Sequence, residues 1–160
     1  MNGFLEVLYD DHEKALVELD QLEKQLDLVR KGELERAKIR IAAFARFLED
    51  SLNLHFVQEE KALFPIMAAK IGPGGPVMVM EMEHNELREA QQALKAELLK
   101  ESIDAERILQ YGSSIIEVLR NHIAKENQVL FPMSEQILSA DDWKKAEELA
   151  AQIALNKDNF

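Results

Sequence analysis

Hydrophobic residues recur at spacings of three and four along most of the chain, which is the period of an amphipathic α-helix. The pattern occupies four long segments and one short one, and no alternating strand pattern occurs in the sequence. We therefore predict helices over about residues 4–30, 33–70, 77–100, 104–137 and 141–156. Four long helices with short connections predict an all-α protein, an up-down-up-down four-helix bundle with a short C-terminal fifth helix.

Glycine and proline mark the predicted connections between these helices. Lys31-Gly32 ends the first segment as a helix C-terminus does, and residues 72–76, Gly-Pro-Gly-Gly-Pro, form the strongest break in the chain. Ser102 or Asp104 can cap the fourth helix. Pro65 falls inside the second segment, and proline kinks or ends a helix, so we expect an irregular helix there.

Length and composition narrow the class of protein. The 160 residues suffice for one domain with a substantial core, so we treat 1–160 as a single domain whose bundle covers about 4–138. The net charge of −11 argues against nucleic acid or an anionic membrane as a partner, because phosphate binding needs clustered lysine and arginine. The absence of cysteine from the sequence excludes disulfides, thiolate zinc sites and iron–sulfur clusters held by its own thiolates. No apolar run approaches transmembrane length, so we expect a cytoplasmic protein.

A polar pair interrupts an apolar run twice, with the same internal spacing. The stretches HFVQEEKALFP and HIAKENQVLFP place His55 four residues before Glu59 and His122 four residues before Glu126. Each glutamate lies about one helical turn beyond its histidine, and side chains lean toward the N-terminus of their own helix. Both carboxylates are therefore expected to reach back toward the level of the histidines.

Each predicted long helix carries one of the four histidines of the chain, on the apolar stripe that faces the bundle axis: His12, His55, His84 and His122. The midpoint between the first two falls at the Gly32 turn, and the midpoint between the last two is Ile103, in the turn before the fourth helix. Residues equidistant from a hairpin turn lie at one height, because the rise per residue is constant. Each hairpin should therefore bring its two histidines level, which places four imidazoles and two carboxylates in one layer.

Metal cations explain why a core would contain such a layer. Two ionised carboxylates buried there are strongly unfavourable or take up protons, unless cations compensate them. A lone core histidine is usually a hydrogen-bonded structural residue, but this interpretation does not explain four inward histidines with glutamate at the same offset twice. Nitrogen and oxygen ligands without sulfur favour a pair of first-row metals, iron ahead of manganese or zinc. A single structural zinc needs only four ligands, so it does not explain the doubled motif. A ferritin-like site needs two Glu-x-x-His motifs, and the chain has only one, Glu81 to His84, which argues against that class.

At these residues the sequence resembles the hemerythrin-like family, the HHE cation-binding domains, over its length to about residue 138. The resemblance implies a four-helix bundle around an oxo- or hydroxo-bridged centre of two iron ions. Carried over by position, the metal ligands are His12, His55, Glu59, His84, His122 and Glu126. The first two histidines would hold one iron and the other two the second, and both glutamates would bridge.

The sequence also departs from the oxygen-carrying members of that family, which have a fifth histidine and an aspartate. Met80 stands where the fifth histidine lies, one turn before His84, and Glu126 replaces the aspartate. Each iron would keep a position for water or a small molecule. The resemblance thus implies binding or reduction of O2, NO or peroxide, with an electron-donor protein as partner. A reversible oxygen binder or sensor, and an iron storage or delivery protein, are the alternatives; we also consider Glu81 and Glu83 as further oxygen ligands near His84.

Overall fold

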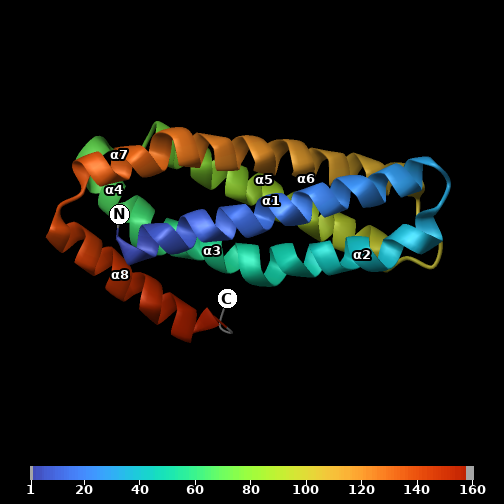
Figure 1. Ribbon diagram of the computed structural model, residues 1–160, viewed down its shortest axis with the longest axis horizontal. Coiled ribbons are helices and arrows are strands. Elements are labelled where there is room, and N and C mark those ends of the chain that lie inside the picture. The colour runs from blue at the N-terminus through green and yellow to red at the C-terminus, as the bar shows by residue number, and fades with distance from the viewer. Residues whose placement is uncertain (1, 158–160) are drawn as a thin grey trace.

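Helices make up nearly all of the computed structural model, which describes residues 2–157 (Figure 1). The first helix, α1 (Gly3–Arg30), begins at a cap in which the Asn2 side chain accepts a hydrogen bond from the Leu5 amide. It ends before Gly32, whose φ of 81° glycine adopts at little cost. The predicted break after the first helix is confirmed.

The second predicted helix is a continuous rod that contains two wide, π-helical turns. Its segments are α2 (Leu34–Phe47), η1 (Leu48–Leu52), α3 (Asn53–Gln58), η2 (Glu59–Leu63) and α4 (Phe64–Ile71). In η2 the Phe64 amide donates to the Glu59 carbonyl five residues back, the spacing of a π-helix. Pro65 follows this turn near the start of α4, so the rod does not end there. The expected irregularity is a widened turn just before the proline, and Pro65 itself lies in the first turn of α4, where a proline is tolerated.

The fourth predicted helix repeats this design. Its segments are α6 (Ala105–Lys125), η3 (Glu126–Leu130) and α7 (Phe131–Ile137). The π-helical turn η3 starts at Glu126, as η2 starts at Glu59, and Pro132 follows it as Pro65 follows η2. The doubled sequence motif thus corresponds to a doubled backbone feature, a wide turn that begins at each glutamate.

The two remaining helices are α5 (Pro76–Leu98) and α8 (Ala140–Leu155). Of the two caps predicted for α6, Asp104 is the one used, since its side chain accepts from the Glu106 amide. Ser139 caps α8 and exchanges hydrogen bonds with Asp142 in a capping box.

The long rods surround a common axis. The first rod, α1, packs against α2 and α6, and α5 packs against the same two helices on the other side (Figure 1). The all-α bundle is therefore confirmed, and α8 lies across one end of it, against α1, α3 and η2. Within residues 2–157 there is no strand, and none of the described helices is long and apolar enough to cross a membrane. The cytoplasmic location stays a prediction.

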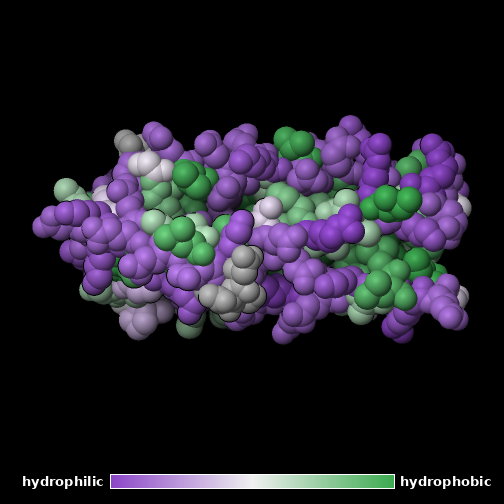
Figure 2. Space-filling view, turned by 90° about the horizontal axis from the view of Figure 1, so that it is seen from below, coloured by the Kyte–Doolittle hydropathy of each residue, from purple (hydrophilic) through white to green (hydrophobic). Residues whose placement is uncertain are grey.

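Two apolar clusters fill the bundle. One includes Leu19 and Leu94 and lies toward the turns that follow α1 and α5. The other includes Leu5 and Phe131 and lies beneath α8. Hydrophilic residues cover most of the outer face in Figure 2, with hydrophobic residues in separate groups. The predicted histidine layer lies where the two clusters meet.

Candidate metal centre

The structure brings the predicted histidines and glutamates together in one buried layer. Every one of these side chains is at most 1% exposed, and the set is His12, His55, Glu59, His84, His122 and Glu126. The ring centroids of the two imidazoles lie 4.9 Å apart in the first hairpin, His12 and His55, and 4.8 Å apart in the second, His84 and His122. The hairpins therefore bring their histidines level, as counting from the turns predicts.

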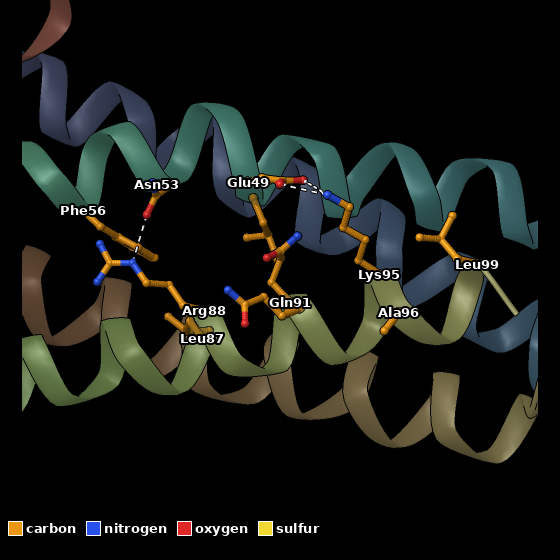
Figure 3. A pocket seen from close by; sticks show the side chains of 11 residues that line it. Glu49, Asn53, Phe56, Leu87, Arg88, Gln91, Lys95, Ala96 and Leu99 are labelled. Atoms are coloured by element: carbon orange, nitrogen blue, oxygen red, sulfur yellow. Dashed lines mark hydrogen bonds and ion pairs between the residues drawn. The ribbon is translucent and has the colours of Figure 1, made fainter. Parts of the chain in front are cut away.

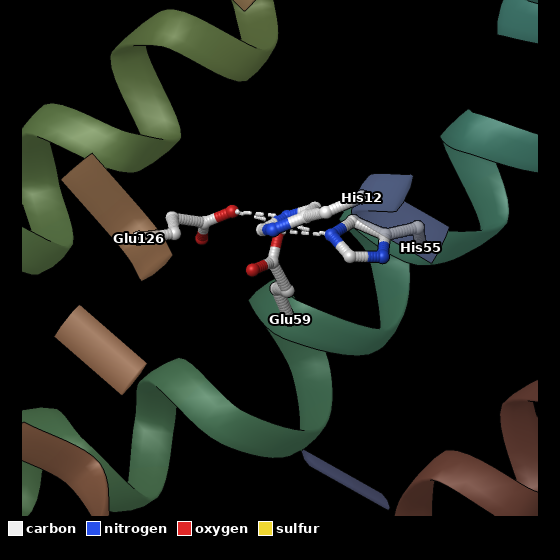
Figure 4. Close-up of side chains that lie close together, drawn as sticks. All are labelled: His12, His55, Glu59 and Glu126. Atoms are coloured by element: carbon white, nitrogen blue, oxygen red, sulfur yellow. Dashed lines mark hydrogen bonds and ion pairs between the residues drawn. The ribbon is translucent and has the colours of Figure 1, made fainter. Parts of the chain in front are cut away.

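Both glutamates contact histidines of both hairpins. Glu59 Oε1 lies 3.3 Å from His55 Nε2 and 3.1 Å from His84 Nε2. Glu126 Oε1 lies 3.0 Å from His12 Nε2 and 3.1 Å from His122 Nε2. Figure 4 shows His12 and His55 with both glutamates, and the imidazoles and carboxylates point toward one another.

The six side chains form two overlapping sets of possible ligands. One set joins His12 and His55 with both glutamates, and the other joins the remaining two histidines with the same glutamates. In each set the ligand atoms lie within 4.8 Å of one another. Two cations could therefore be held side by side and share the carboxylates.

Each histidine uses Nδ1 to hydrogen-bond a polar side chain on a neighbouring rod. The pairs are His12 with Asn127 (2.6 Å), His55 with Asp11 (3.0 Å), His84 with Glu60 (2.7 Å) and His122 with Glu83 (2.9 Å). An ionised carboxylate only accepts, so in the last three pairs Nδ1–H donates. This fixes the tautomer in which the lone pair of Nε2 faces the centre, the arrangement in which metal-binding histidines are usually held.

Sequence reasoning missed the role of these outer partners, of which it named only Glu83, as a possible metal ligand. Each stands next to a proposed ligand in the chain: Asp11 before His12, Glu60 after Glu59, Glu83 before His84 and Asn127 after Glu126. Each rod thus supplies a ligand and a partner for the histidine of another rod, in a closed ring around the bundle. A polar residue directly beside one ligand on each rod was the available signal.

One of the expected oxygen ligands has a different place. Glu83 bonds His122 Nδ1 on the outer side of the layer, and its second oxygen pairs with Lys125. Glu81 is exposed. The hypothesis that either carboxylate is an additional ligand beside His84 is therefore wrong, because α5 turns them away from the Nε2 atoms.

The polar atoms at the centre need a partner that the described side chains do not supply. Both oxygens of Glu59, one oxygen of Glu126 and Nε2 of His55 are buried without a hydrogen bond. The Nε2 atoms of His84 and His122 face each other at 3.2 Å, and when both rings are neutral in the tautomer described above, both atoms are acceptors. Cations between these atoms would satisfy all of them, and nitrogen with carboxylate oxygen suits iron.

Without metal, protons take the place of that positive charge. Burial lowers the pKa of His122, but the carboxylates of Glu126, Glu83 and Glu59 outweigh it and raise the pKa to about 9. Burial is likewise overcome at His55, where neighbouring carboxylates raise the pKa well above its ordinary value. The layer therefore holds cationic histidine beside carboxylate near neutral pH, and metal binding must displace these protons.

The chain is similar to known proteins over most of its length. Residues 3–134 match the family described as the hemerythrin HHE cation binding domain. The iron-sulfur cluster repair protein YtfE of Cronobacter sakazakii is 30% identical over 136 residues, which cover 79% of this chain and 62% of the relative. The protein of the same name from an Enterobacter species is 28% identical over 131 residues, which cover 76% and 60%. The chain thus spans about 60% of the length of these relatives, and it belongs to the hemerythrin family of HHE cation-binding domains.

Proposed function

We propose that this chain is a non-haem di-iron protein that binds or reduces a small ligand, O2, NO or peroxide, at a carboxylate-bridged centre. The observation that carries the proposal is that Glu59 and Glu126 each contact a histidine of both hairpins. A carboxylate in that position can serve two metals at once. A site for one metal would not need both halves.

In this proposal the rods hold the ligands ready before metal arrives. The iron pair, when bound, supplies electrons and open coordination positions for the small ligand. The outer hydrogen bonds fix the direction of each Nε2 atom, and the two carboxylates balance the charge. Phe131 stacks on the ring of His12 at 5.1 Å between centroids, and Phe56 stacks on His84 at 4.0 Å. These rings exclude water from the layer on two sides, which favours binding of a small uncharged molecule.

Metal analysis of anaerobically purified protein, with optical spectra before and after O2 and NO, tests this function. We expect two irons per chain and a charge-transfer band of a bridged iron pair after exposure to O2. Turnover of NO or peroxide with an electron donor would support reduction. A stable, reversible oxygenated spectrum would support an oxygen carrier instead. One metal per chain would contradict the proposal.

Iron delivery is the second candidate, and the relatives favour it because they are named as iron-sulfur cluster repair proteins. The same layer would then release its metal instead of retaining it. Transfer of iron from the loaded chain to an apo-acceptor protein distinguishes this candidate from ligand reduction. Retention of both irons in the presence of an acceptor would count against delivery by this chain alone.

A further inference from the structure

The two halves of the layer differ in the chemistry of their outer partners. His84 and His122 both donate to carboxylates, Glu60 and Glu83. His12 instead donates to the neutral amide oxygen of Asn127. A carboxylate acceptor strengthens an imidazole as a metal ligand more than an amide does, because it stabilises positive charge on the ring. His12 is therefore the weakest of the four nitrogen donors.

A second difference is how firmly the outer partners are held in place. Arg88 donates from both terminal nitrogens to the two oxygens of Glu60, at 2.9 Å each, and its Nε donates to Asn53 (Figure 3). Glu83, the outer partner of His122 in the same half, pairs with Lys125. Asp11, which holds His55, has no lysine or arginine within ion-pair distance among residues 2–157. The outer carboxylates that hold His84 and His122 are thus fixed by ion pairs, and within the described chain the outer partners of His12 and His55 are not.

Aromatic packing adds to the same difference. His84 stacks against Phe56 and Phe64, at 4.0 Å and 5.8 Å between ring centroids. Arg88 covers the outer side of Phe56, 5.6 Å from the ring centre, at the end of a surface groove of about 560 Å³ (Figure 3). Phe56 also lines the groove, so its ring, partly covered by Arg88, lies between the groove and His84. His12 stacks on one phenylalanine ring, Phe131.

We infer that the two metal positions are unequal: the position of His12 and His55 exchanges its metal first, and that of His84 and His122 retains it. Asn127, as the acceptor for His12, makes the first position the weaker metal site. The Glu60–Arg88 and Glu83–Lys125 pairs act as positioning residues that make the second position the stronger one. This inference rests on the proposed two-metal centre. A protein built in this way would give up one metal readily and keep the second.

Repulsion between the metals and the two outer cations works against this order. Each cation is paired with a carboxylate, and the side chains of Arg88 and Lys125 are 28% and 46% exposed. Solvent and the paired carboxylates screen such charges strongly. Loss of an outer partner typically lowers metal affinity about 10- to 100-fold, so the partners decide the order.

The rate of iron removal by a chelator tests the inference. Anaerobic protein loaded with ferrous iron is mixed with excess ferrozine, and the coloured complex is followed over time. We expect two phases of equal amplitude, one iron each, with rates that differ about tenfold or more. Asn127→Asp should slow the fast phase about tenfold and leave the slow phase unchanged. Arg88→Gln should speed the slow phase and leave the fast phase unchanged.

Arg120→Gln is the matched control, because Arg120 also pairs with two carboxylates and is 34% exposed, but its partners Asp20 and Glu23 hold none of the four histidines. It should change neither phase. Release of both irons in a single phase, or an effect of Asn127→Asp confined to the slow phase, would overturn the inference while leaving the two-iron centre intact. Fewer than two irons before the chelator is added would instead overturn the proposed function.

Discussion

The apolar end of the bundle and the histidine layer are built from the same rods but are stabilised differently. At the apolar end Leu19, Leu94 and Ile115 are fully buried and belong to one apolar cluster. Each such side chain contributes about 2 kcal/mol by burial, whatever the solution contains. In the layer the carboxylates of Glu59 and Glu126 are equally buried, and their burial is unfavourable unless positive charge accompanies it.

The difference separates folding from function. The apolar end holds the rods in register without any partner, so the ligands are in position before a metal arrives. The layer then gains or loses stability according to the metal and proton concentration. Changes in the two regions should therefore have different dependences on metal and pH, which the following experiments measure.

The largest effect is expected for the double variant Glu59→Ala, Glu126→Ala. Without the shared carboxylates the chain should bind no iron pair, and it should lose the whole stabilisation by metal, about 4 kcal/mol at free metal a thousand times Kd. Metal analysis and thermal melts with and without ferrous iron measure both losses. The exposed pair Glu6→Ala, Glu117→Ala is the matched control. Two metals bound to the double variant would contradict the bridging role.

Leu94→Ala should act on stability alone. Removing this fully buried side chain leaves a cavity and lowers the free energy of unfolding by about 3 kcal/mol, equally with and without metal. Urea denaturation of both forms measures the change, and metal analysis should still find two irons. If the variant lost its metal as well, the apolar end would not be independent of the layer.

The pH dependence of stability should have opposite signs in the two forms of the protein. The raised pKa of His122, about 9 when folded against about 6.5 when unfolded, stabilises the metal-free protein below pH 6.5. That contribution, on the order of 3 kcal/mol, is lost as the pH rises to 9. The iron-loaded protein should gain stability over the same range, because protons compete with metal for the histidines. Denaturation of both forms at pH 6.5 and pH 9 measures the two dependences. A metal-free protein that is more stable at pH 9 than at pH 6.5 would refute the prediction.

Met80→His should have the smallest effect on stability and a visible effect on the spectrum. Met80 is 3% exposed and lies one turn before His84, where a histidine can reach the second metal position. We expect a change of about 1 kcal/mol or less in the iron-loaded protein, with a spectrum shifted toward reversible oxygen binding. Met80→Leu serves as the control. An unchanged spectrum would count against an open coordination position at that iron.

Much of the centre could be predicted because its determinants are local. The positions of His12, His55, His84 and His122 on apolar stripes follow from helical periodicity, and their common level follows from counting to each turn. Neither step requires knowledge of how the rods are rotated. The wide turns at Glu59 and Glu126 could not be predicted from periodicity, since a π-helical turn inserts only one residue and leaves the apolar pattern nearly intact.

Spacing along a helix decides which residues face inward, so the helices, the bundle, the family and the six side chains of the layer could all be read from the amino-acid sequence. Which polar residue holds which histidine depends instead on how the helices pack against one another. His12 and Asn127 are 115 residues apart, and His55 and Asp11 are 44 apart. Their meeting depends on the rotation of neighbouring rods, which packing sets across the whole bundle. The inequality of the two metal positions is therefore a property of the assembled fold, and no single segment of the chain contains it.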